Sequence, residues 1–100
     1  MVAALERYQA QWEELIDRWF DRECWMRVNA ELDELRRLVA AVPEFSADLM
    51  QVTMRHAQLL RSLIKPPAEG KAAEVTALRR KLGAAVDGLR NKCLRVLGVS

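Results

Sequence analysis

The chain has 100 residues, which is the size of one small domain, predicted here to span residues 1–100. Apolar residues make up 51% of it and charged residues 30%, a balance that excludes a disordered tail. No apolar run approaches the roughly 20 residues that a membrane-spanning helix needs, so no membrane contact is predicted.

The net charge of +2 conceals an acidic first half and a basic second half. Residues 1–48 hold eleven acids and six bases, and residues 49–100 hold three acids and ten bases. We expect the two halves to attract each other when they pack side by side. The alternative is that the basic half forms a face for an acidic partner or a nucleic acid.

Residues 2–42 contain neither glycine nor proline, and charged and large apolar residues alternate throughout. The pattern predicts one long helix over about 3–42. At 100° per residue, one side of this helix carries Leu5, Tyr8, Trp12, Leu15, Ile16, Trp19 and Met26. Nearly the opposite side carries Cys24, Val28, Leu32, Leu35, Leu38, Val39 and Val42.

The apolar stripe therefore jumps by close to half a turn around Asp21–Trp25. An apolar stripe with a seven-residue repeat shifts around a straight helix by only about 20° per heptad, so this gradual shift cannot produce the jump. Either the helix breaks near Phe20–Cys24, or it stays straight and its halves face different partners. Because no proline or glycine lies there, we favour the straight helix.

Pro43 should end the first helix, since the residue before a proline is driven from helical backbone. A second helix is predicted over 47–64, with Ser46 as its N-cap. Phe45 and Met50 have the spacing of a hydrophobic staple. The predicted core face consists of Leu49, Val52, His56, Leu59, Leu60, Leu63 and Ile64.

Residues 65–71 contain two prolines and a glycine and should form a turn. A third helix is predicted over 72–97, ending before Gly98. Its stripe consists of Val75, Leu78, Leu82, Ala85, Val86, Leu89, Cys93 and Val96. Small residues, Ala73, Ala77, Ala84 and Gly88, align on its back, either as helix-favouring filler or as a face for close approach by another helix.

These lengths predict an all-α, three-helix antiparallel bundle with an extended first helix. At about 1.5 Å per residue the first helix would reach roughly 60 Å, and the shorter helices could cover only part of it. The aromatic half should then project and expose more apolar surface than a monomer tolerates. We therefore predict a homodimer, whose interface would contain Leu5, Tyr8, Trp12, Leu15 and Trp19.

The sequence predicts no catalytic, cofactor or metal site. His56 is the only histidine and lies on an apolar helix face, where a hydrogen-bonded core residue is the expected role. Cys24 and Cys93 lack the paired spacing of zinc ligands. Since no leader segment begins the chain, both are expected to be reduced, buried thiols of a cytoplasmic protein.

The predicted function is a non-enzymatic helical interaction or assembly module that self-associates. One alternative is a small chaperone or adaptor for a helical client protein, because the size and shape are similar to those of the small chaperones of flagellar and type III secretion systems. The other is a weak nucleic-acid-binding module using Arg79, Arg80, Lys81, Arg90, Lys92 and Arg95. Nucleic acid is the less favoured partner, because neither helix-turn-helix spacing nor interleaved aromatic residues accompany these arginines and lysines.

Overall fold

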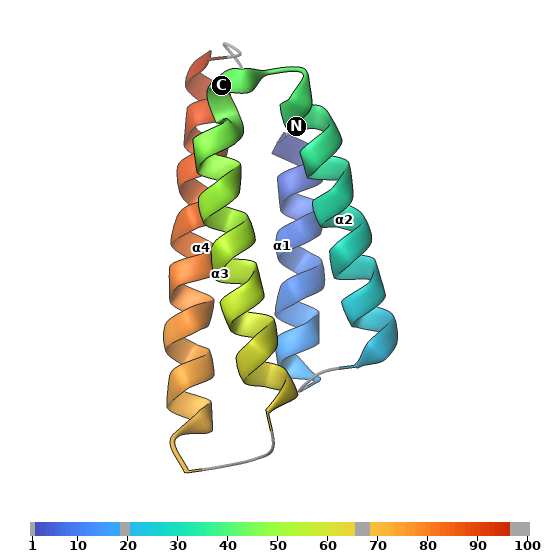
Figure 1. Ribbon diagram of the computed structural model, residues 1–100, viewed down its shortest axis with the longest axis vertical. Coiled ribbons are helices and arrows are strands. Elements are labelled where there is room, and N and C mark those ends of the chain that lie inside the picture. Colours follow the sequence, from blue (N-terminus) through green and yellow to red (C-terminus); the bar gives the residue numbers. More distant parts are fainter. Residues whose placement is uncertain (1, 19–20, 66–68, 97–100) are drawn as a thin grey trace.

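A computed structural model describes residues 2–18, 21–65 and 69–96, and these residues form four α-helices (Figure 1). The helices are α1 (Val2–Asp17), α2 (Arg22–Ala40), α3 (Ser46–Ile64) and α4 (Lys71–Val96), and a short 3-10 helix, η1 (Pro43–Phe45), precedes α3. The described residues contain no β-strand. The all-α class is confirmed, but the bundle has four helices where three were predicted.

The predicted helix over 3–42 is wrong because the chain reverses between α1 and α2. Asp21 has extended backbone, with φ −113° and ψ 129°, and its carboxylate caps α2. It accepts hydrogen bonds from the backbone amides of Glu23 at 2.9 Å and Cys24 at 3.3 Å. The hydrogen bond from the Cys24 amide, and to a smaller extent that from Glu23, holds the pKa of the Asp21 carboxyl below its usual value. A side-chain cap satisfies the free amides at a helix start, so the reversal requires no glycine or proline.

The reversal also explains the jump of the apolar stripe. Because α1 and α2 lie antiparallel (Figure 1), the described α1 members of the first stripe and Cys24, Val28, Leu32, Leu35 and Val39 of the second are all buried in one core. Met26, predicted on the first stripe, is exposed on α2, and Trp19 lies outside the described residues. The molecule measures 45 × 23 × 20 Å, which is shorter than the roughly 60 Å of the predicted first helix. The aromatic half therefore does not project from the bundle.

The four helices form an up-and-down bundle in which sequence neighbours are antiparallel (Figure 1). The most extensive packing joins α3 to α4 and α1 to α2, and less extensive packing joins α1 to α4 and α2 to α3. The bundle is thus two helical hairpins placed side by side. Their shared core contains at least one buried apolar residue from every helix and buries Phe45 of η1 as well.

The start of α3 differs in detail from its prediction. Pro43–Phe45 forms a turn of 3-10 helix that leads directly into α3, so Ser46 is the first residue of α3 and does not act as its N-cap. The expected staple is also absent from this described segment, because Phe45 is buried while Met50 is 71% exposed. The predicted end of this helix at Ile64 is confirmed.

The end of α3, the start of α4 and the course of α4 agree with the sequence; Pro66, Pro67 and Ala68 of the predicted turn lie outside the described residues. Lys71 extends its ammonium group to the end of α3, where it donates to the backbone carbonyls of Leu63 and Lys65. Gly70 has a φ of 83°, a value that suits glycine best. α4 then runs from Lys71 to Val96; Leu97 and Gly98, the predicted end, lie outside the described residues.

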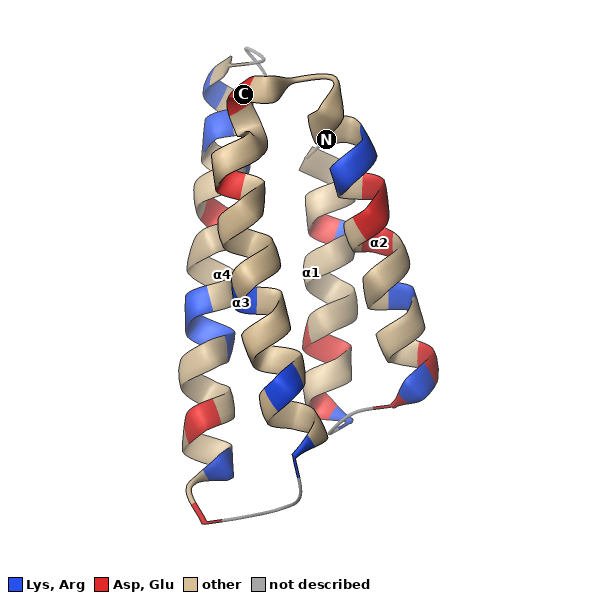
Figure 2. Ribbon diagram, viewed as in Figure 1, with Lys and Arg blue, Asp and Glu red and all other residues tan. Residues whose placement is uncertain are grey.

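Ion pairs connect the acidic and basic halves of the chain. Arg79 of α4 lies 3.7 Å from Glu13 of α1. Lys92 lies 2.8 Å from the carboxylate of Asp48 and also donates to the backbone carbonyl of Glu44. Figure 2 shows acidic positions along α1 and α2 and basic positions along α4. None of the described helices has the length and apolar character needed to cross a membrane.

Candidate functional site

Four of the five residues predicted to form a dimer interface are occupied by the chain's own packing. Leu5, Tyr8, Trp12 and Leu15 are all buried in the shared core. Trp19, the fifth, lies outside the described residues. The premise of an exposed aromatic half is therefore wrong, because α2 folds back along α1 and α4 covers another side of it. Any self-association has to use a different surface.

His56 and Tyr8 form a buried polar pair in the middle of the bundle. The phenol oxygen of Tyr8 and Nδ1 of His56 are 2.8 Å apart, and their rings stack with centroids 5.8 Å apart. Burial, with a smaller effect from the positive charge of Arg36, lowers the pKa of His56 to about 4. Burial raises the pKa of Tyr8. Near neutral pH both groups are therefore uncharged, and the hydrogen bond gives the Tyr8 hydroxyl and Nδ1 of His56 a partner in the core.

The two cysteines are buried in different parts of the bundle. Cys24 lies in the first turn of α2 and Cys93 near the end of α4, and no disulfide joins them. Arg27 donates to the sulfur of Cys24 at 3.2 Å. Within the described ranges, no group of three or more histidine, cysteine or acidic residues has the geometry of a metal site.

Three of the six basic residues considered for nucleic-acid contact are engaged in ion pairs. Arg79 pairs with Glu13, Arg90 with Asp87 at 3.1 Å, and Lys92 with Asp48. These pairs reduce the charge that α4 can offer to a phosphate backbone. Lys92 serves the bundle itself by holding α4 to the start of α3.

The most distinctive exposed feature is a line of apolar side chains along the outer side of α3. Met50 is 71% exposed, Met54 43% and Ile64 60%, and the small residues Ala47 and Ala57 are exposed in line with them. Arg61, also exposed, continues the same line. We call this set the α3 stripe; its members are Ala47, Met50, Met54, Ala57, Arg61 and Ile64.

The α3 stripe repeats at the spacing of a helix-packing seam. Successive members are separated by three, four, three, four and three residues, which is the heptad alternation of a coiled coil. At 100° per residue these positions lie on the side of α3 opposite the buried face formed by Val52, His56 and Leu63. α3 therefore has two apolar faces, and the bundle covers only one.

Sequence reasoning missed the α3 stripe, although its signal was present. Met50 was assigned to a staple and Ile64 to the core, so the remaining members had no apparent pattern. Counting both apolar series along residues 46–64 would have separated them, because each has its own constant phase. The exposed apolar residues elsewhere, Met26 and Val96, lie on other helices and do not extend the line.

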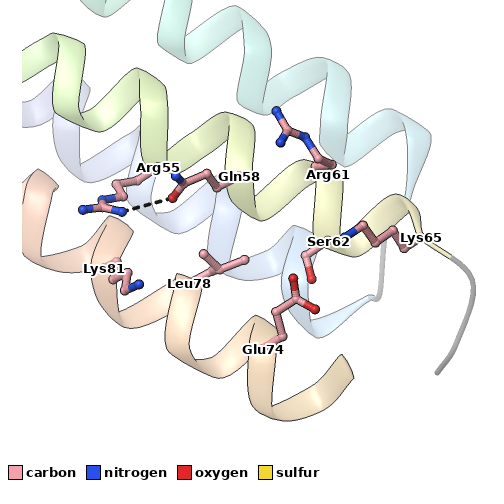
Figure 3. Close-up of a pocket in the computed structure, with 8 residues that line it drawn as sticks. All are labelled: Arg55, Gln58, Arg61, Ser62, Lys65, Glu74, Leu78 and Lys81. Atoms are coloured by element: carbon pink, nitrogen blue, oxygen red, sulfur yellow. Dashed lines mark hydrogen bonds between the residues drawn. The ribbon is translucent and has the colours of Figure 1, made fainter. Parts of the chain in front are cut away.

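A second surface feature is a polar groove of about 280 Å³ between α3 and α4 (Figure 3). Its lining consists of Arg55, Gln58, Arg61, Ser62, Lys65, Glu74, Leu78 and Lys81. In Figure 3, Arg55 and Lys81 lie at one end, and Ser62 and Glu74 lie at the other. Lys65 lies beside Ser62 at the same end as Glu74 in Figure 3, so basic side chains line both ends, and Glu74 is the one carboxylate among the lining residues. The groove is therefore polar and largely basic, whereas the α3 stripe is mainly apolar.

No family model, curated protein or solved structure matches the chain, so the indications of its function lie in its own surfaces.

Proposed function

We propose that this protein is a non-enzymatic helical interaction module and that it binds another helix along the α3 stripe. The observation that carries the proposal is the alignment of Met50, Met54 and Ile64, three large and exposed apolar side chains, at heptad spacing on one helix. Isolated exposed apolar residues are common, but a continuous line along a whole helix marks a contact surface.

The chemistry of the stripe suits a helix better than a small molecule. Methionine side chains are flexible and polarizable, so they adapt to the surface of a partner. The two small residues, Ala47 and Ala57, leave hollows beside the larger side chains, and another helix can pack into such hollows. The burial of Leu5, Tyr8, Trp12 and Leu15 removes α1 from consideration, so α3 replaces it as the surface of the predicted interaction.

Site-specific photo-cross-linking in the native cell tests the proposal. A photoreactive residue such as benzoylphenylalanine replaces Met54 on the stripe or, as the control, Met26, which is 59% exposed on α2. The expected result is a covalent adduct with another protein chain from position 54 and none from position 26. Absence of an adduct at position 54, or equal adducts at both positions, would contradict the proposal.

The mass of the adduct separates the two kinds of partner. A partner of the chain's own 11.4 kDa mass indicates self-association, and any other mass indicates a client protein of the kind expected for a chaperone or adaptor. Either result supports an interaction module.

A further inference from the structure

We infer that the partner helix is α3 of a second copy, packed antiparallel along the α3 stripe about a two-fold axis. The inference rests on the proposed function, because it names the partner of the same surface. Two-fold dimers are the commonest assemblies of a single chain, and they require a surface that is complementary to itself. The α3 stripe meets this requirement in its spacing, its side-chain sizes and its charges.

The spacing of the stripe reads the same in both directions. The intervals of three, four, three, four and three residues form a palindrome centred between Arg55 and His56. When a second α3 runs antiparallel about that centre, every stripe residue of one copy faces a stripe residue of the other. A helix surface without this symmetry would align only part of its seam with a second copy.

The facing residues are complementary in size. Ala47 faces Ile64 of the second copy, and Met54 faces Ala57. Each of these layers combines one large and one small side chain, which is the arrangement that fills a helix interface without voids or overlap. In the third kind of layer Met50 faces Arg61, whose aliphatic stem can pack on the methionine while its charged end stays in water.

The charges of α3 also favour the antiparallel arrangement. Exposed Glu44 precedes the helix, and exposed Arg61 and Lys65 lie at its end. An antiparallel copy brings Lys65 opposite Ser46, two residues from Glu44, and aligns the two helix dipoles favourably. A parallel copy would instead place Arg61 against Arg61, where two like charges repel.

The residues that flank the seam contain no like-charge conflict. Gln51 and Gln58 border the stripe on one side and Thr53 on the other, and all three are uncharged. About the two-fold axis, the edge that carries Gln51 and Gln58 meets the same edge of the second copy, so uncharged side chains meet there. The hydroxyl of Thr53 already donates to the backbone carbonyl of Leu49 at 2.9 Å, so it needs no new partner at the interface.

Light scattering and sedimentation of the purified protein over a range of concentrations test the dimer. The expected result is a concentration-dependent mass that rises from 11.4 kDa toward twice that value. Met54→Glu should raise the dissociation constant at least about tenfold, because it places a carboxylate in the centre of an apolar seam. Met26→Glu is the matched control and should leave the constant unchanged. Circular dichroism verifies that both variants are folded.

Two further measurements test the antiparallel register. Met50→Glu should weaken the dimer less than Met54→Glu does, because its carboxylate faces Arg61 of the second copy. Chains carrying Met54→Cys should form a mixed disulfide with chains carrying Ala57→Cys faster than either chain links to its own kind. Wild-type protein is the blank for the two buried native cysteines. Faster linkage between like chains would overturn the antiparallel arrangement.

The outcomes distinguish this inference from the proposed function. A mass that stays at 11.4 kDa at every concentration overturns the second copy as partner. If position 54 then still cross-links to a different protein in the cell, the interaction module stands with another partner. If position 54 cross-links to nothing, both proposals fail.

Discussion

Helices α1 and α3 differ in the number of apolar faces that they carry. α1 holds two of the four described Phe, Trp and Tyr side chains, Tyr8 and Trp12, yet its apolar residues form one face, and that face is buried. α3 contains no aromatic residue other than His56, but it has a buried face and an exposed one. The comparison teaches that aromatic content does not indicate which helix of this bundle exposes apolar surface. The number of separate apolar phases on one helix does indicate it.

The largest expected effect is a loss of folding stability when a core residue of α1 is replaced. Trp12→Ala should lower the free energy of unfolding by about 3–5 kcal/mol, because the indole is buried in the core and its removal leaves a cavity. Denaturant unfolding measures this loss. Met54→Ala on the α3 stripe is the comparison variant and should alter the dimer dissociation constant with little loss of stability. A Trp12→Ala protein of unchanged stability and weaker association would restore α1 as the interface.

The second effect is a pH dependence of stability that arises from His56, which hydrogen-bonds Tyr8 and so joins the buried face of α3 to α1. Burial, and to a smaller extent Arg36, lowers the pKa of His56 to about 4, so the unfolded chain binds a proton more readily than the folded one. Stability should therefore fall as the pH drops from 6.5 toward 4, and this residue should contribute a loss of about 2 kcal/mol at pH 5.

Urea unfolding at pH 7 and pH 5 measures this dependence. Carboxylates also titrate in this range, so the decisive quantity is the difference between the wild type and His56→Leu, which has no imidazole. The variant should lose less stability than the wild type between the two pH values. An equal loss in both proteins would show that His56 is not held neutral by the core.

The smallest effect concerns α4, whose outer surface is lined with small residues. Gly88 is exposed in the middle of the helix, and a Cβ atom there would meet no heavy atom within 4 Å. Gly88→Ala should therefore raise the free energy of unfolding by up to about 1 kcal/mol through helix propensity. The dimer dissociation constant should not change. Weaker association of the variant would instead identify α4 as a face for close helix packing.

Local features of the sequence were sufficient for much of the fold. Pro43 ends the first half of the chain, and the turn containing Gly70 separates the last two helices close to the predicted bounds. Most of the buried stripe of α4, including Leu82, Val86 and Leu89, was also predicted, but Val96 at its end is 44% exposed. These predictions succeeded because helix ends and stripe phases depend on neighbours within one or two turns.

The break between α1 and α2 was weighed as an alternative, and the preference for a straight helix was wrong. The preference relied on the absence of proline and glycine near Asp21. The aspartate itself supplied the signal, because it favours an N-cap position and a negative charge there stabilises the helix that follows. A breaker residue is one way to end a helix, and a strong cap for the next helix is another.

The sequence by itself determined that this protein is helical, where most of its helices lie, and the phase of each apolar stripe. The tertiary structure alone decided which stripes become core. A stripe shows that a helix needs a partner, but the partner is chosen by contacts between residues far apart in the chain. Once α1 and α2 fold back on each other and pack against α3 and α4, Tyr8 and Trp12 are enclosed while Met50 and Met54 remain exposed.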